Sequence, residues 1–151
     1  MSREFPERPI VGIGVVVWRG SRVLLIRRGK PPRVGQWSLP GGAQHVGETV
    51  EAAGRREVLE ETGLPLAAIE LLTVVDLIER ATDDRVRYHY TLVDFVAEAG
   101  DGEPVPGDDA AEARWFAMDE LPGLGLWTET LRIIDMARER LPALRRQLVG
   151  S

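Results

Sequence analysis

The sequence contains no cysteine and no apolar stretch long enough to cross a membrane. The absence of cysteine excludes a disulfide framework, a thiolate nucleophile and a zinc site built on Cys ligands. The longest apolar run, Ile10–Trp18, is far shorter than the roughly 20 residues that a membrane-spanning helix needs. The N-terminal segment also lacks the apolar core of a signal peptide. These absences predict a protein of the cytoplasm, which is a reducing compartment, without a membrane partner.

Positive charge is scarce relative to negative charge. With 19 Lys and Arg residues against 24 Asp and Glu residues, the net charge of −5 argues against binding to a nucleic acid polymer or an anionic membrane surface. A small anionic ligand such as a nucleotide remains compatible with a local basic pocket. The chain has 151 residues, 44% of them hydrophobic, and no internal repeat, so it is expected to form a single domain over residues 1–151.

Apolar and alternating segments predict two β-hairpins and one further short strand. The expected strands are Ile10–Trp18 with Val23–Arg28, Ile69–Ile78 with Arg85–Glu98, and Ala113–Phe116. Between them lies an exposed acidic loop over residues 99–111, which is rich in Gly, Asp and Pro.

Two helices are expected among these strands. Thr49 is a plausible N-cap for a helix that runs to about Thr62, where Gly63 ends it. A closing helix is expected from Thr128 or Thr130 to about Arg140. Strands and helices in this order predict an α/β fold with α/β/α layers around a mixed sheet.

Three glutamates, Glu57, Glu60 and Glu61, have the helical spacing i, i+3, i+4 near the end of the first helix. Like charges at this spacing destabilise a helix by roughly 0.2–0.5 kcal/mol per pair, and the negative end of the helix dipole adds to the cost. A bound cation would offset this repulsion, and convergent oxygen donors are what Mg²⁺ prefers. The alternative is an ordinary solvated acidic helix face.

Arg56 precedes the first glutamate and is expected to pair with Glu60 at i+4, either to fix its carboxylate or as a weak surface ion pair. On a helical wheel Ala52 and Leu59 lie roughly opposite the glutamates. We therefore expect these two residues to face the core and the carboxylates to point away from it.

The glutamates are part of a longer sequence pattern that begins at Gly42. It reads Gly42, five residues, Glu48, seven residues, Arg56-Glu57-Val58, one residue, Glu60-Glu61, one residue, Gly63-Leu64. This pattern over residues 42–64 resembles the full Nudix box, and Trp37–Gly42 and Arg114–Phe116 resemble the segments that flank it in that family. The resemblance implies a Nudix-like α/β/α sandwich with a central mixed β-sheet. It also implies hydrolysis of a nucleoside diphosphate linked to another moiety.

The resemblance implies direct coordination of Mg²⁺ or Mn²⁺ by Glu57, Glu60 and Glu61. Gly42 has no side chain, so its carbonyl can approach a metal closely, although a plain tight turn would use the same residue. Glu48 is either a cap at the positive end of the helix dipole or, as the resemblance favours, part of the metal site. His45 stands where many relatives carry glutamate, which leaves an additional carboxylate in doubt.

Hydrolysis of this kind needs a group that takes a proton from the attacking water. Glu60 and Glu61 are candidates, with Arg56 beside them, but a carboxylate bound to a metal is a weaker base than a free one. Relatives often draw the base from a later loop, here residues 99–111. Its candidates, which are otherwise solvated loop acids, are first Asp109 and then Asp108 and Glu112.

Substrate contacts are expected upstream of the box. Arg27, Arg28 and Arg33 lie on the first hairpin and the loop after it, and we expect them to contact phosphates, with Gly41 nearby. Candidates for stacking on a base, all of which are more often core residues, are Trp18, Trp37, Tyr88 and Tyr90.

The substrate itself is predicted by resemblance alone. Val74–Asp76 and Tyr88–Phe95 resemble bacterial ADP-ribose pyrophosphatases, so the first choice is ADP-ribose, cleaved to AMP and ribose 5-phosphate. The nearest alternative is a pyrophosphohydrolase that removes oxidised nucleoside triphosphates. An alternative of another class is a nucleotide-sensing or protein-binding module without turnover. Relatives are frequently homodimers, so the resemblance also admits a homodimer.

Overall fold

A computed structural model describes residues 3–31 and 33–149 of the chain. Its elements, in order, are β1 (Ile10–Arg19), β2 (Arg22–Arg28), β3 (Trp37–Ser38), β4 (Gly41–Ala43), α1 (Val50–Thr62), β5 (Leu66–Arg80), β6 (Val86–Ala99), β7 (Ala110–Ala117), the 3₁₀ helix η1 (Met118–Leu124) and α2 (Thr128–Val149). The predicted strands and helices occur in the expected order, and the structure adds β4 and η1. β5 and β7 are longer than predicted, whereas β6 has the predicted length and is shifted by one residue.

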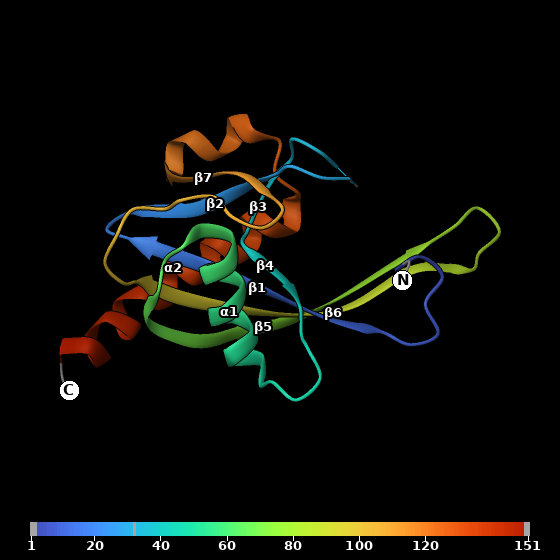
Figure 1. Ribbon diagram of the computed structural model, residues 1–151, viewed down its shortest axis with the longest axis horizontal. Helices are drawn as coiled ribbons and strands as arrows, with labels where there is room; N and C mark the ends of the chain where they lie inside the picture. Colours follow the sequence, from blue (N-terminus) through green and yellow to red (C-terminus); the bar gives the residue numbers. More distant parts are fainter. Residues whose placement is uncertain (1–2, 32, 150–151) are drawn as a thin grey trace.

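The strands form one mixed sheet with β1 at its centre (Figure 1). The main order is β3-β2-β1-β6-β5, and β4 pairs with β1 while β7 pairs with β2. β1 and β6 run parallel, from the pair Ile10 and Tyr90 to the pair Trp18 and Glu98. All other strand pairs are antiparallel, including both expected hairpins, β1–β2 and β5–β6. The prediction of a mixed sheet is therefore confirmed.

Helices cover both faces of this sheet, α1 on one side and α2 on the other (Figure 1). Successive residues of a strand point to opposite faces, and β1 serves both cores in this way. Its Val16 and Trp18 belong to the cluster packed with α2, while Val15 and Val17 belong to the cluster packed with α1. The α/β/α sandwich expected from the sequence is thus confirmed. No helix in the described part of the chain has the length and apolar character to span a membrane.

The caps of α1 are those predicted. The Thr49 hydroxyl accepts a hydrogen bond from the backbone N–H of Ala52 at 3.0 Å. Gly63 ends the helix with φ of 73°, a left-handed conformation that glycine adopts without steric cost.

The buried face of α1 differs from the one predicted. Leu59 is 54% exposed and Ala52 is also exposed, while Ala53, Gly54 and Val58 face the sheet. The expectation that Ala52 and Leu59 face the core was therefore wrong. Gly54 explains the difference, because a Cβ atom there would lie 3.3 Å from side-chain atoms of both Val15 and Ile69, so the helix approaches the sheet along a glycine.

The second helix, α2, continues beyond its predicted end near Arg140 to Val149. Pro142 lies inside it, where a proline removes one backbone hydrogen bond. The side chains that α2 buries lie on both sides of this proline, and they are Ile133, Ile134, Ala137, Leu141 and Leu144. Burial of this apolar stripe outweighs the local cost of the proline.

The short strand β4 brings backbone unusually close to β1. Gly41 pairs with Gly14, and Gly42 pairs with Ile13. A Cβ atom on Gly41 would lie 1.9 Å from the carbonyl oxygen of Ile13, a distance at which no side chain fits. Glycine at this position is therefore required for β4 to pair with β1.

We predict that Gly41→Ala separates β4 from β1 and destabilises the protein by about 3 kcal/mol or more. Thermal unfolding followed by circular dichroism should show a fall in Tm of roughly 10 °C. Gly123→Ala is the matched control, because a Cβ atom on Gly123 meets no atom within 4 Å. An unchanged Tm for Gly41→Ala would contradict this account of β4.

Candidate functional site

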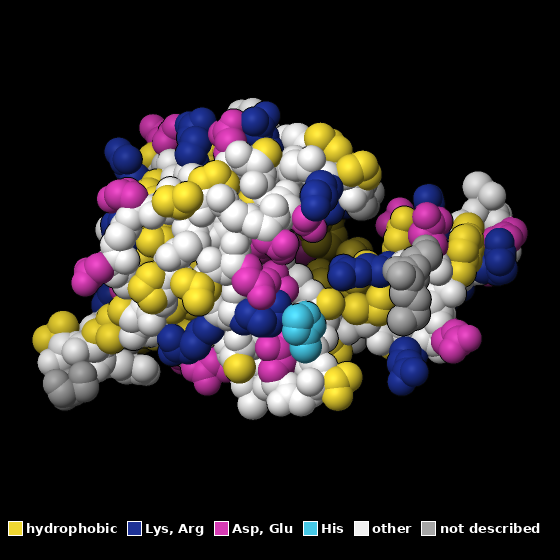
Figure 2. Space-filling view, viewed as in Figure 1, with side chains coloured by type: hydrophobic (Ala, Val, Ile, Leu, Met, Phe, Trp, Pro, Cys, Tyr) yellow, Lys and Arg dark blue, Asp and Glu magenta, His cyan; other side chains and the backbone are white. Residues whose placement is uncertain are grey.

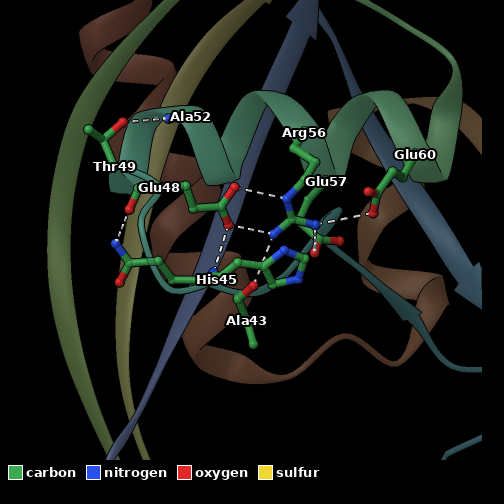
Figure 3. A network of polar contacts seen from close by, with 9 residues as sticks. Ala43, His45, Glu48, Thr49, Ala52, Arg56, Glu57 and Glu60 are labelled. Carbon is green, nitrogen blue, oxygen red and sulfur yellow. Dashed lines mark hydrogen bonds and ion pairs between the residues drawn. The ribbon is translucent and has the colours of Figure 1, made fainter.

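The Arg56 guanidinium, in the middle of α1, is the centre of a polar network that extends to the loop before the helix (Figure 3). It donates to Glu48 twice, at 2.7 and 3.0 Å, to Glu57 at 2.7 Å and to Glu60 at 3.2 Å. A further bond of 3.1 Å reaches the carbonyl oxygen of Ala43 in β4. The predicted Arg56–Glu60 pair is confirmed, and it is one part of a larger arrangement that joins α1 to β4.

Glu48 lies in the loop before α1, where Thr49 rather than Glu48 caps the helix. Besides its two bonds from Arg56, Glu48 accepts a hydrogen bond of 2.7 Å from the backbone N–H of His45. Hydrogen bonding to Arg56, followed by that to the backbone at His45, lowers the pKa of Glu48 to about 2. His45 itself is exposed. In this arrangement Glu48 positions Arg56 and shapes the loop.

Glu57 and Glu61 are buried against the two glycines of β4. Their exposed fractions are 8% and 6%. A Cβ atom on Gly42 would lie 2.5 Å from Oε1 of Glu57, and the N–H of Gly41 donates to Oε1 of Glu61 at 2.7 Å. The two carboxylates therefore face the backbone of β4, on the inner side of α1. The expectation that they point away from the core was wrong.

Burial changes the protonation of both carboxyl groups. It raises the pKa of Glu61 to about 8, against the opposing hydrogen bond from Gly41 and with added repulsion from Glu57 and Asp108. Burial also raises the pKa of Glu57, where Arg56 opposes the shift. For both groups, the nearby hydrogen-bond donors and positive charge do not fully offset the effect of burial on the pKa.

The donor set suits a hard divalent cation, because carboxylate and carbonyl oxygens are the ligands that Mg²⁺ and Mn²⁺ prefer. Glu57, Glu61 and the Gly42 backbone lie together, whereas Glu60 is more exposed, with 43% of its side chain accessible. With the side chains in these positions, the described residues contain no group of three or more acidic or histidine side chains gathered around one point. Arg56 occupies Glu57 and Glu60 instead, at 2.7 and 3.2 Å.

The acidic loop after β6 lies against the end of α1. Backbone bonds tie Val105 to Thr62 at 2.8 Å and Gly107 to Glu61 at 3.1 Å. Asp109 pairs with Lys30 at 2.9 Å, whereas Asp108 lies close enough to Glu57 and Glu61 to raise the pKa of both. The loop therefore presents Asp108 rather than Asp109 to the glutamates. Glu112, the third candidate, lies in β7 rather than in the loop and pairs with Arg27 at 2.5 Å.

The three predicted phosphate-binding arginines have different surroundings. Arg28 is near enough to Glu61 to lower its pKa. Arg27 is occupied by Glu112, and Arg33 lies in the loop after β2 with φ of 64°. The structure thus brings Arg28 to the glutamates and holds Arg27 in an ion pair.

The four aromatic residues predicted to stack on a base also lie in different surroundings. Trp18 is 1% exposed and belongs to the core. Trp37 packs edge-on against Phe116, with ring centroids 4.9 Å apart. Tyr90 lines a pocket next to β4, and Tyr88 lies further out on β6.

That pocket, with a volume of about 270 Å³, was not identified in the sequence. Its lining comes from β1, β4, β6 and the start of α2, and includes Gly42, Tyr90, Leu92, Asp94, Trp127 and Glu129. Figure 2 shows a hollow with apolar side chains at its base beside a group of acidic side chains. The one sequence signal for it was Asp94, an acid within the apolar stretch Leu92–Ala97.

Comparisons with known proteins find related sequences and structures. Residues 8–136 match the NUDIX domain family. The chain is 38% identical over 116 residues to an ADP-ribose pyrophosphatase of Methanocaldococcus jannaschii, covering 77% of this chain and 66% of that protein's length. It is 34% identical to a putative 8-oxo-dGTP diphosphatase 3 of Mycobacterium tuberculosis, in an alignment that covers 85% of this chain and 74% of the relative.

Solved structures give the same fold. A MutT NUDIX hydrolase from Burkholderia pseudomallei superposes with a TM-score of 0.74 at 37% identity, over 86% of this chain and 98% of that one. The NUDIX domain of Shewanella oneidensis NrtR, solved with ADP ribose, also gives a TM-score of 0.74, at 23% identity, over 89% of this chain and 90% of that domain. At that lower identity the second likeness supports the fold alone.

The raised pKa of Glu61 predicts how stability depends on pH. The folded protein binds this proton up to about pH 8, whereas an unfolded glutamate loses it near its ordinary pKa of 4.5. The folded state therefore binds more protons between these values, and stability falls as pH rises from about 5 to 8, by at most about 1.4 kcal/mol per pH unit for this group. We predict that Glu61→Gln reduces this slope, because Gln keeps the acceptor for Gly41 but does not ionise.

The measurement is urea unfolding with a chelator present, at several pH values from 5 to 8. Glu57 and Asp94, whose pKa values burial also raises, contribute to the slope in the same direction, so the slope is reduced and not abolished. Glu51→Gln, on the exposed side of α1, is the control that should retain the full slope. An identical slope in wild type and Glu61→Gln would rule out this protonation of Glu61.

Proposed function

The chain belongs to the Nudix family, whose members hydrolyse phosphoanhydride bonds, and from this membership we propose that it cleaves the pyrophosphate bond of a nucleoside diphosphate linked to another moiety. The observation that carries the proposal is the placement of Glu57 and Glu61 against the Gly41–Gly42 backbone, with Arg56 holding Glu57 and Glu60. Buried carboxylates with raised pKa values are typical of sites that bind a cation or transfer a proton.

We propose that Mg²⁺ or Mn²⁺ binds at Glu57, Glu60 and Glu61, with the Gly42 carbonyl and Glu48 contributing directly or through water. When bound, such an ion neutralises phosphate charge and lowers the pKa of water. The residues themselves fit this role, because positive charge would reverse the effect of burial on Glu57 and Glu61. Arg56 would then keep Glu48 oriented while Glu57 and Glu60 exchange its bonds for the ion.

Glu60, Glu61 and the loop acids are the candidates for the group that accepts a proton from water. Glu61 is buried and faces Gly41, whereas Asp108 is a loop residue next to both buried glutamates. We propose Asp108 as the proton acceptor in place of Asp109, whose carboxylate pairs with Lys30. A carboxylate that does not bind a metal is a stronger base than one that does.

ADP-ribose is the first choice of substrate, and the similarity to the archaeal ADP-ribose pyrophosphatase supports it. Arg28 would contact its phosphates, with Arg27, Arg33 and Gly41 as further contacts. Hydrolysis of an oxidised nucleoside triphosphate is the second candidate. The similarity to the mycobacterial putative 8-oxo-dGTP diphosphatase 3 and the presence of a compact pocket beside β4 favour it.

We predict that the purified protein hydrolyses one of these substrate classes only with Mg²⁺ or Mn²⁺, and that Glu60→Gln lowers kcat by roughly 100-fold or more. The substitution removes charge at constant volume from a side chain that is 43% accessible, so the fold should persist. Glu51→Gln on the same helix is the matched control.

The measurement is phosphate release after coupling to a phosphatase, with and without metal. The panel is ADP-ribose, NADH, sugar nucleotides, diadenosine polyphosphates and nucleoside triphosphates. Full activity of Glu60→Gln would remove this residue from the mechanism. If the pure wild-type protein turns over none of the panel with metal present, it is a binding module.

A second prediction separates the two loop aspartates. Asp108→Asn should lower kcat by roughly 100-fold, the lower end of what a general base contributes, and should flatten the acidic limb of the pH–rate profile. Asp109→Asn removes the ion pair with Lys30 and should leave kcat within a few-fold of wild type. The reverse result would move the role to Asp109.

A further inference from the structure

Asp94 is a buried acid in the centre of the sheet. It lies on β6 opposite Gly14 of β1, and only 6% of its surface is exposed. A Cβ atom on Gly14 would lie 2.5 Å from Oδ1 of Asp94, so the carboxylate occupies the space that a side chain at position 14 would fill. The neighbouring strand residues Val93 and Phe95 point into the core packed with α1. Asp94 points to the opposite face, toward the start of α2.

Asp94 has no hydrogen bond and no salt bridge with any residue that the structure describes. Arg132 is close enough to lower the pKa of Asp94, but its Nε and one terminal nitrogen both donate hydrogen bonds to Glu129. Burial and then repulsion from Glu129 raise the pKa of Asp94 to about 6. A buried polar group without a partner lowers stability. Packing alone therefore gives no reason for an acid at this position.

The carboxylate instead faces the pocket of about 270 Å³ beside β4. The pocket walls are apolar and aromatic, from Leu39, Tyr90, Leu92, Trp127 and Ile133. Gly42, which lies against the carboxylate of Glu57, also borders this pocket. Its polar lining is small, and besides Asp94 it consists of Arg3, Ser38, Glu129 and Thr130. A mostly apolar and aromatic pocket with a few polar groups is typical of a small-molecule site.

We propose that Asp94 is a specificity-determining residue that accepts a hydrogen bond from the amino group of a purine base seated in this pocket. This inference rests on the proposed function, since it places the base of the nucleotide substrate on the other side of β4 from Glu57 and Glu61. A carboxylate oxygen accepts hydrogen bonds and donates none when ionised, so it selects an N–H edge over a carbonyl or a bare ring edge. The 6-amino group of adenine and the 2-amino group of guanine both supply such an edge.

The test measures binding of matched nucleoside 5′-monophosphates by calorimetry, with a chelator present so that no metal site contributes. GMP is compared with IMP, which lacks only the 2-amino group. AMP is compared with purine riboside 5′-monophosphate, which lacks only the 6-amino group. We expect the wild-type protein to bind the amino-bearing member of one pair roughly 10- to 100-fold more tightly, the effect of one hydrogen bond to a charged group. The pair that responds identifies the base.

Asp94→Leu should bring this ratio close to one, because leucine has a similar volume and no hydrogen-bond acceptor. Its Tm without ligand should be equal to or above that of wild type, since the substitution removes an unpartnered buried charge; a merely structural role predicts a lower Tm and an unchanged ratio. Glu98→Gln is the matched control, as it removes a carboxylate from the same strand that pairs with Arg145 outside the pocket.

The inference is overturned if the wild-type protein discriminates within neither pair, or if Asp94→Leu keeps the wild-type ratio. These outcomes are distinct from failure of the proposed function. Discrimination in binding without hydrolysis of any substrate would overturn the enzymatic proposal alone. Hydrolysis with metal that is indifferent to the amino group would overturn only the role of Asp94.

Discussion

The guanidinium of Arg56 is the interaction on which the rest of the site depends. Glutamates at helical spacing near the C-terminal end of α1 repel one another and face the negative end of the helix dipole. Arg56 offsets that repulsion by bonding to Glu48, Glu57 and Glu60 at once, and its bond to the Ala43 carbonyl fixes it to β4. The planar guanidinium has enough donors for all these acceptors, whereas the compact ammonium of a lysine does not. One side chain thus joins the helix, the preceding loop and the sheet.

The close approach of β4 to β1 and α1 explains why two of these glutamates are buried. Gly41 and Gly42 lack side chains, so the carboxylates of Glu57 and Glu61 reach the strand backbone and become buried. Gly42 also lines the pocket that contains Asp94. A three-residue strand therefore separates an acidic site on the α1 side from an apolar pocket on the α2 side. A side chain on either glycine would displace β1 or Glu57.

Local signals made much of the fold predictable from the sequence. The caps Thr49 and Gly63, both hairpins and the Arg56–Glu60 pair depend on residues close together in the chain, and the structure has each of them. The buried face of α1 was not predictable from a helical wheel, because Gly54 and two charged residues lie on it while Leu59 is exposed. The burial of Asp94 was not predictable from local sequence, because it depends on strands that are far apart in the chain. The metal ligands, the catalytic roles and a homodimer remain predictions.

Glu57, Glu61 and Asp94 share one physical property, which is that burial raises the pKa of each without a partner that fully offsets the cost. A fold optimised for stability alone would replace such groups by apolar residues of similar volume. A ligand can offset the free-energy cost of burying these groups if it provides the interaction that the protein lacks. The two glutamates lack further positive charge, and Asp94 lacks an N–H donor. Under the proposed function, the base of a nucleotide supplies the N–H donor to Asp94. Its phosphates share with Glu57 and Glu61 the cation that supplies the positive charge. The buried carboxyl groups on the two sides of β4 would then recognise the phosphates and the base of the same nucleotide.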